Sequence, residues 1–222
     1  MNADVAEVIN SAVREYYTAA IEQHGPTPKG VDWGDEWSHR IRHEQFLRLF
    51  QQDRAASVAD LGCGYGDFLR VLREDGHQGD YVGCDLSPAM IDAASSVFGD
   101  APGVRWCVGD TPPTICDFTV ASGIFNVRRG TDVRGWASHV DATIDKLARF
   151  SKLGFGFNML SLCSDAEKRR EDLYYADPVD VLKTCIERYG RHVAILQDYG
   201  LWEFTVLVRH SSHTASPKPV SP

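Results

Sequence analysis

Two patterns of apolar residues alternate along the chain, and together they predict an α/β protein. Short apolar runs rich in β-branched residues predict buried strands at 58–61, 81–85, 104–108, 118–123 and 152–160. Apolar residues at helical spacing predict helices at 3–23, 35–51, 132–150 and 178–190. Strands that alternate with helices in this way are typical of a mostly parallel sheet covered on both faces.

The C-terminal part of the chain departs from this alternation. Two apolar runs, 192–199 and 201–209, are joined at Gly200 and predict an antiparallel hairpin. The stretch 211–222 is rich in Ser and Pro and is expected to be disordered. With 222 residues, of which 43% are hydrophobic, the chain can form one domain with a full core.

A long segment precedes the first predicted strand. Its two helices are separated by a break rich in Pro and Gly at 24–30. The second helix is expected to bury an apolar side made of Trp37, Ile41, Phe46, Leu49 and Phe50. We therefore expect residues 1–52 to form a helical lid or substrate segment, and residues 53–210 to form the cofactor-binding domain.

The first predicted strand leads directly into three alternating glycines and then into a helix. Gly62, Gly64 and Gly66 allow backbone dihedrals closed to other residues and let a ligand lie against the main chain at a helix N-terminus. A dinucleotide fingerprint, G-x-G-x-x-G, would need a third glycine where this chain has Asp67. The loop therefore predicts a nucleotide-type cofactor, with a tight turn that binds nothing as the alternative.

A second predicted strand ends in an acid about twenty residues after this loop. Asp85 closes the run 81–85, and Ser87 and Pro88 follow as the N-cap and first turn of a helix. A carboxylate at this place lies beside the glycine loop and can accept hydrogen bonds from both ribose hydroxyls of a nucleoside. A plain strand-end carboxylate is the alternative, but the pairing with the glycine loop favours the ligand.

These two motifs, Asp60-Leu61-Gly62-Cys63-Gly64-Tyr65-Gly66 and the strand that ends at Asp85, resemble the first two motifs of the class I S-adenosylmethionine (SAM)-dependent methyltransferases. The resemblance extends over 57–209 in the order of elements. It implies a Rossmann-like, seven-stranded, mostly parallel sheet whose last strand is antiparallel, with helices on both faces and an N-terminal helical lid. It also implies SAM as the cofactor and methyl transfer as the reaction.

The resemblance implies cofactor contacts from the glycine loop, from the ends of the next three strands and from the N-terminal segment. These residues are Asp60, Gly62, Cys63, Gly64, Asp85, Leu86, Gly109, Asp110, Thr111, Ser122, Tyr17, Trp33 and Arg40. Asp110 stands where the family places an acid that meets the adenine amino group, and a turn cap before Pro112 is the alternative. For the three N-terminal residues, the alternative is aromatic core packing and a solvated arginine.

Acceptor contacts are expected in the N-terminal segment, near the ends of the fourth and fifth strands, and in the charged loop 161–178, because long loops in compact domains often act as lids. The candidates are Tyr16, Phe125, Asn126, Asn158, Tyr174 and Tyr175. Packing on the following helix is the alternative for the two loop tyrosines. Residues 122–127 lack the N/D-P-P-Y/F signature of enzymes that methylate exocyclic DNA amines or glutamine amides. The N-terminal segment carries Tyr16, Tyr17, Trp33 and Trp37, which favour an enclosed aromatic pocket. We therefore expect a small-molecule acceptor with a hydroxyl, an amine or a carboxylate.

Charge and cysteine content narrow the partners. A net charge of −8 argues against binding nucleic acid over a broad surface, because phosphate neutralisation needs clustered Lys and Arg. Six cysteines without C-x-x-C pairs indicate reduced, mostly buried thiols and a cytoplasmic protein. The N-terminal residues contain no long apolar run, so neither a secretory signal nor a membrane span is expected. The oligomeric state stays open.

No metal site and no catalytic base are predicted. His39 and His43 are four residues apart on a predicted helix, a spacing that can bind metal, but no H-E-x-x-H pattern accompanies them and surface positions are favoured. His139 is expected on a helix surface, and His24 lies in the Pro/Gly break, where a lid could carry it. Methyl transfer from a sulfonium needs mainly an aligned acceptor, so a metal is not required.

Two other functions are compatible with parts of the pattern. A NAD(P)-type oxidoreductase could place Asp85 on an adenosine ribose, but the chain lacks the third glycine and a Tyr-x-x-x-Lys pair for hydride chemistry. A non-catalytic SAM-binding subunit that serves an active partner would carry the same motifs as an enzyme.

Overall fold

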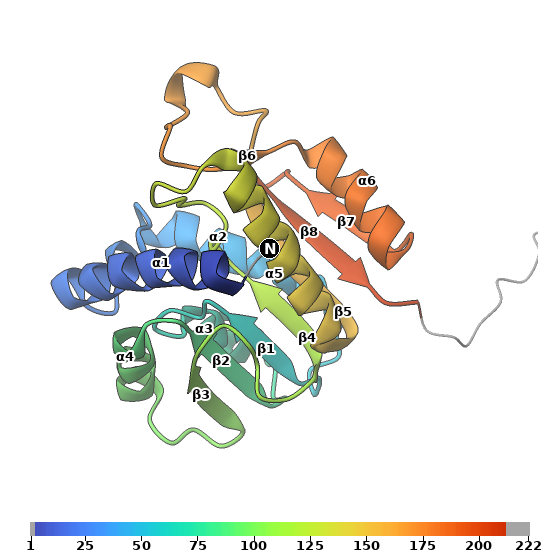
Figure 1. Ribbon diagram of the computed structural model, residues 1–222. Coiled ribbons are helices and arrows are strands. Elements are labelled where there is room, and N and C mark those ends of the chain that lie inside the picture. Colours follow the sequence, from blue (N-terminus) through green and yellow to red (C-terminus); the bar gives the residue numbers. More distant parts are fainter. Residues whose placement is uncertain (1–2, 212–222) are drawn as a thin grey trace, which may run out of the picture.

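A mixed β-sheet forms the centre of the computed structural model, which describes residues 3–211. Its strands are β1 (Val58–Leu61), β2 (Tyr81–Asp85), β3 (Val104–Val108), β4 (Cys116–Ala121), β5 (Ser151–Ser161), β6 (Tyr175–Ala176), β7 (Val193–Leu196) and β8 (Glu203–Arg209). They follow the order β3-β2-β1-β4-β5-β8-β7, and the short β6 pairs with β5 outside this path. Figure 1 shows this sheet with its helices around it.

The direction of the strands matches the prediction. Strands β1 to β5 are parallel, whereas β8 runs antiparallel to both of its neighbours, β5 and β7. The mostly parallel, Rossmann-like sheet with an antiparallel final strand is therefore confirmed. The sheet has eight strands instead of seven, because the loop predicted at 161–178 forms a short parallel pair with the end of β5.

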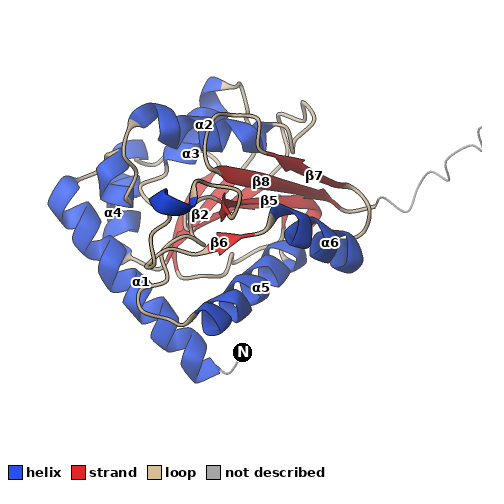
Figure 2. Cartoon of the chain, turned by 90° about the horizontal axis from the view of Figure 1, so that it is seen from above, coloured by secondary structure: helices blue, strands red, loops and turns tan. Residues whose placement is uncertain are grey.

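Helices cover both faces of the sheet. They are α1 (Ala3–His24), α2 (Glu36–Leu47), α3 (Asp67–Glu74), α4 (Pro88–Phe98), α5 (Val133–Arg149) and α6 (Pro178–Tyr189), with 3-10 turns η1 (Pro28–Val31) and η2 (Ala166–Lys168). Seen from above, α5 and α6 lie on one side of the sheet and α2 and α3 on the other (Figure 2). Each side has its own apolar core, one built around Trp136 and Phe157 and the other around Phe46 and Phe68.

Helix α2 buries a different face from the one predicted. Asp35 caps its first turn, because the Asp35 side chain accepts a hydrogen bond from the Ser38 N–H over 2.8 Å. Trp37, which was expected inside, is 59% exposed, whereas Phe46 is fully buried as expected. The rest of the buried face is polar and consists of Ser38, His39, Arg42, His43 and Gln45. The sequence predicted a mostly apolar buried face that includes Trp37, whereas most of the side chains that α2 buries are polar.

Two further predictions concern the chain ends and membranes. Residues 212–222, most of the tail predicted to be disordered, lie outside the described residues. Within residues 3–211, no helix combines the length and the apolar character that crossing a membrane requires.

Candidate active site

The glycine loop between β1 and α3 has the predicted backbone conformations. Gly62, Gly64 and Gly66 have φ angles of 72°, 54° and 85°, which residues with a side chain rarely adopt. A Cβ atom at Gly62 would also lie 2.2 Å from Cγ2 of Ile124. The Gly62 N–H donates to the carbonyl of Cys84 on β2 over 2.8 Å. Glycine is therefore required at position 62 by its dihedral angle and by the space available.

Asp85 connects the end of β2 to this loop. Its Oδ2 accepts a hydrogen bond from the Gly64 N–H over 3.0 Å, and its Oδ1 accepts one from the Ser87 N–H over 2.8 Å. Burial raises the pKa of Asp85 to about 6, while these two hydrogen bonds favour the carboxylate. A carboxylate has about four lone-pair sites, so Asp85 can still accept hydrogen bonds from a ligand. Ser87 caps α4 as predicted, because its Oγ accepts from the Met90 N–H.

A second carboxylate is buried beneath the loop. Asp60 on β1 is 2% exposed, and its Oδ2 accepts a hydrogen bond from the Tyr81 hydroxyl over 2.6 Å. Burial raises the pKa of Asp60 to about 7, against the Tyr81 hydrogen bond and with a smaller contribution from the nearby charge of Asp85. The loop therefore lies on two acids that both ionise above the usual range of a carboxyl.

Asp110, after β3, is held by a cation from α5. The Lys146 ammonium donates to Asp110 Oδ2 over 2.5 Å, and Asn10 and Thr111 also donate to this carboxylate over 3.4 and 2.9 Å. Burial raises the pKa of Asp110, but these hydrogen bonds and the positive charge outweigh it, so the net pKa lies below the usual value. Asp110 is therefore an anchored carboxylate and not a simple cap of the turn before Pro112.

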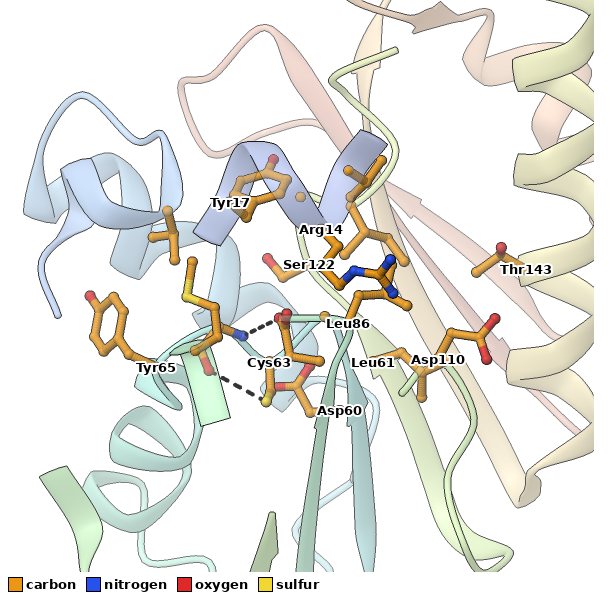
Figure 3. A pocket seen from close by; sticks show the side chains of 18 of the residues that line it. Arg14, Tyr17, Asp60, Leu61, Cys63, Tyr65, Leu86, Asp110, Ser122 and Thr143 are labelled. Atoms are coloured by element: carbon orange, nitrogen blue, oxygen red, sulfur yellow. Dashed lines mark hydrogen bonds between the residues drawn. The ribbon is translucent and has the colours of Figure 1, made fainter. Parts of the chain in front are cut away.

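One cavity joins the glycine loop to the N-terminal segment. It is lined by residues of α1, the glycine loop and the ends of the neighbouring strands. Figure 3 shows Arg14 and Tyr17 on α1 above the loop that carries Cys63. Trp33 forms another wall of the cavity. Its ring packs so closely against Gly123 that a Cβ atom added to Gly123 would lie 2.4 Å from Cζ2 of Trp33. The glycine loop and the N-terminal segment therefore face the same cavity.

Most of the predicted cofactor residues line this cavity. They are Asp60, Gly62, Cys63, Gly64, Asp85, Leu86, Gly109, Asp110, Ser122, Tyr17 and Trp33. Thr111 is not among them, because its exposed side chain turns to Asp110. Arg40 is not among the lining residues either, and its exposed guanidinium pairs with Glu44 and Glu74 over 2.7 and 2.5 Å.

The predicted acceptor residues do not line the cavity. Phe125 is fully buried in the core, and the Asn126 carbonyl accepts a hydrogen bond from the Tyr174 N–H. Tyr174 and Tyr175 line a separate groove between α5 and α6, which agrees with the packing alternative. The Tyr16 hydroxyl donates to Asp32 Oδ2 over 2.9 Å.

Asn158 lies behind the cavity wall. Its Oδ1 accepts a hydrogen bond from the Gly123 N–H over 2.7 Å, and its Nδ2 donates to Ser122 Oγ over 3.3 Å. It therefore holds two wall residues in position and does not contact the cavity itself.

Several cavity residues could not be found from the sequence pattern. His39 and His43 were expected at the surface, yet both are 5% exposed and line the cavity together with His139. Burial, with Arg42 and Arg70 nearby, lowers the pKa of His39 to about 4. The pKa of His43 is also far below the usual value, mainly through burial. Both imidazoles are neutral near pH 7. Their spacing on α2 was the only available signal.

A buried ion pair connects this helix to the end of the sheet. Arg42 Nε donates to Glu203 Oε2 over 2.6 Å, and the two side chains are 8% and 2% exposed. The Tyr199 hydroxyl donates to the other oxygen of Glu203 over 3.2 Å. The Arg42 guanidinium also stacks on the Trp33 ring, 3.8 Å from its centroid. The pair therefore fixes α2 to β8 and supports one wall of the cavity.

The sheet order, the glycine loop and Asp85 define a Rossmann-like protein that binds a nucleoside cofactor at the carboxyl ends of its strands. A family model described as a methyltransferase domain matches residues 58–150. The chain is 46% identical over 166 residues to Rv1506c of Mycobacterium tuberculosis, a protein named as a proposed methyltransferase; the match covers 75% of this chain and 100% of the relative. The chain therefore belongs to the SAM-dependent methyltransferases.

Solved structures agree with this fold. Magnesium protoporphyrin IX methyltransferase from Synechocystis PCC 6803, bound to S-adenosylhomocysteine (SAH), superposes with a TM-score of 0.68 at 13% identity and covers 90% of this chain and 99% of its own. The N-methyltransferase NodS from Bradyrhizobium japonicum, also bound to SAH, superposes with a TM-score of 0.65 at 18% identity. This match covers 90% of this chain and 100% of NodS. Both relatives bind the product of SAM, and SAM is the cofactor of this family. The oxidoreductase alternative is therefore set aside.

Proposed function

We propose that this methyltransferase transfers the methyl group of SAM to a hydroxyl, amine or carboxylate of a small molecule held between the glycine loop and the N-terminal segment. The observation that carries this proposal is the single cavity lined both by Gly62, Gly64 and Asp85 and by Tyr17 and Trp33. A cofactor on the loop and an acceptor against the aromatic walls would share one enclosed space. Enclosed, partly aromatic pockets suit small ligands better than broad macromolecular surfaces.

The carboxylates have separate proposed roles towards SAM. Asp85 accepts hydrogen bonds from the ribose hydroxyls, because its oxygens lie at the end of β2 beside Gly64. Asp110, fixed by Lys146 at the end of β3, lies where it can accept a hydrogen bond from the adenine amino group. Asp60 supports the loop through Tyr81 and is a positioning residue.

The reaction itself needs alignment more than covalent help. A lone pair of the acceptor forms a bond to the methyl carbon, the bond between carbon and sulfur breaks, and its electron pair stays on sulfur as SAH forms. A hydroxyl or amine acceptor also releases a proton, whereas a carboxylate becomes a neutral ester without proton loss. Holding the acceptor atom in line with the methyl group converts a bimolecular step into an effectively unimolecular one. The rigid walls made by Trp33 and the glycine loop support this role.

The test is a methyl-transfer screen with labelled SAM against a metabolite library, with bulk tRNA, rRNA and protein extract in parallel. The proposal expects label in a small molecule only. Trp33→Ala should lower kcat/KM for that acceptor, whereas Trp37→Ala is the matched control because Trp37 is exposed and lies outside the cavity. Label transferred to a macromolecule, or equal losses in both variants, would show that the proposed acceptor site is wrong.

A further inference from the structure

We propose that His39, His43 and Asp67 form a binding site for one divalent transition-metal ion in the wall of the cavity. The two histidines come from the buried face of α2, and Asp67 comes from the first turn of α3. One ligand atom from each residue lies within 4.8 Å of the other two. All three residues line the cavity, and Asp67 is not one of the carboxylates assigned to SAM.

The distances fit a small coordination shell. Asp67 Oδ2 lies 3.5 Å from Nδ1 of His39 and 3.8 Å from Nδ1 of His43. In a tetrahedral zinc site with bonds of about 2.0–2.1 Å, neighbouring ligand atoms are roughly 3.3–3.4 Å apart. The observed separations are close to this value and too long for strong hydrogen bonds between the same atoms. An ion could therefore occupy the space between them after small side-chain shifts.

The unsatisfied polar atoms provide independent support. The His43 side chain is only 6% exposed. Its Nδ1 is buried and has no hydrogen-bond partner among the described residues. Buried polar atoms are normally paired, and each exception needs an explanation. Metal coordination would use this nitrogen. The Tyr65 hydroxyl, 3.5 Å from His39 Nδ1, is at the limit of hydrogen bonding and leaves that nitrogen available.

Asp67 is already oriented for this role. Arg70 Nη1 lies 2.9 Å from Asp67 Oδ1, which leaves Oδ2 facing the two imidazoles. Charged partners that hold one oxygen of a ligating carboxylate are common in metal sites. Arg42, which lies near His39, is paired with Glu203 and so does not compete for Asp67.

The donor set indicates the kind of ion. Two imidazole nitrogens and one carboxylate oxygen suit Zn²⁺, Co²⁺ or Fe²⁺, whereas Mg²⁺ and Ca²⁺ prefer oxygen ligands alone. Three protein ligands leave at least one coordination position open, as in catalytic zinc sites. Because His39, His43 and Asp67 all line the cavity, that position would face the space proposed for the acceptor.

The experiment measures metal binding without turnover. The full chain is dialysed against a chelator, the chelator is removed, and Zn²⁺ and Co²⁺ binding are followed by calorimetry and by visible absorption. We expect one ion per chain, and a Co²⁺ spectrum of low coordination number without the near-ultraviolet band of cysteine ligation. Mg²⁺ should not compete.

Variants then assign the site. Asp67→Asn and His43→Gln should each weaken the affinity for Zn²⁺. Loss of an outer-shell partner typically costs about 10- to 100-fold in metal affinity, and we expect a larger loss here because a direct ligand is removed. His192→Gln and Asp92→Asn are matched controls at exposed positions and should bind as the wild type does. Circular dichroism of the metal-free variants shows whether each has folded, and Asp67→Asn keeps the shape of the side chain in case His43→Gln does not fold.

Two results would overturn the proposal. One is the absence of stoichiometric Zn²⁺ binding to the folded wild type. The other is Zn²⁺ binding that is equally strong in the folded Asp67→Asn variant and in the controls. Binding of SAM to the metal-free protein is measured separately, so failure of the metal site is distinguishable from failure of the proposed methyl transfer.

Discussion

Replacing Glu203 with Gln tests whether the buried ion pair holds α2 on the sheet. The substitution keeps the size of the side chain and one hydrogen-bond acceptor, but it removes the charge opposite Arg42, 2.6 Å away. Arg42 would then be a buried guanidinium without a counter-ion. Removing one partner of a buried pair typically costs about 3–5 kcal/mol. Because Gln can still accept the hydrogen bond from Arg42 Nε, we expect the free energy of unfolding to fall by about 3 kcal/mol.

Urea unfolding followed by circular dichroism measures this loss. Arg42→Met and the double variant complete a thermodynamic cycle, and the double variant should be more stable than the sum of the two single changes predicts, because it leaves no unpaired charge. Asp165→Asn is a control, since it breaks an exposed pair with Lys168 at 2.8 Å and such pairs contribute little.

The same variants test the connection to the cavity. Arg42 stacks on Trp33 at 3.8 Å, so Arg42→Met should also weaken acceptor or SAM binding in protein that is still folded. If Glu203→Gln and Asp165→Asn change the free energy of unfolding equally, the pair does not hold α2 in place. Additive effects in the cycle would refute the reasoning as well.

Three further predictions concern the glycine loop and its acids. Asp85→Ala should weaken SAM binding by about 1.5–3 kcal/mol, since it leaves ribose hydroxyls and the Gly64 N–H without an acceptor; calorimetry that finds an unchanged affinity would contradict the assignment. Gly62→Ala should be less stable to urea than Gly76→Ala, because both have positive φ but only Gly62 has a neighbour within 4 Å; equal losses would leave backbone strain as the whole effect. Burial raises the pKa of Asp60 from 3.8 to about 7, so ionisation should destabilise the folded protein progressively between these values. Asp60→Asn should therefore be more stable than the wild type at pH 8 and lose this advantage near pH 4, as urea titrations at both pH values would reveal.

The features that the sequence predicts well depend on local backbone requirements. Gly62, Gly64 and Gly66 all have positive φ, and alternating glycines between a strand and a helix indicate this directly. Ser87 followed by Pro88 predicts a helix start for the same local reason. The succession of strands and helices along the chain follows from the alternation of apolar runs. Each of these inferences uses residues that are close together in the chain.

The acceptor side could not be predicted in the same way. The sequence places Tyr174 and Tyr175 in a long charged loop, which is typical of a lid. In the structure β6 pairs with β5, and both tyrosines line a separate groove. Arg40 is one position beyond the buried His39, and a rotation of about 100° per residue places it on the outer face of α2. The phase of a short helix with mixed composition depends on its packing partners, which the sequence does not name.

The packing of α2 also bears on the predicted division of the chain into an N-terminal lid, residues 1–52, and a cofactor-binding domain. Phe46, Leu49 and Phe50 belong to the core around Phe68, so α2 is part of the main fold. Helix α1 contacts η1 and α4, and α1 and η1 supply Tyr17 and Val31 to the cavity. The polar inner face of α2 supplies His39 and His43 to the cavity, whereas its Arg42 pairs with Glu203. Within the N-terminal segment, we therefore infer that α1 and η1 cover the cofactor, while α2 forms the fixed wall on which the histidines lie.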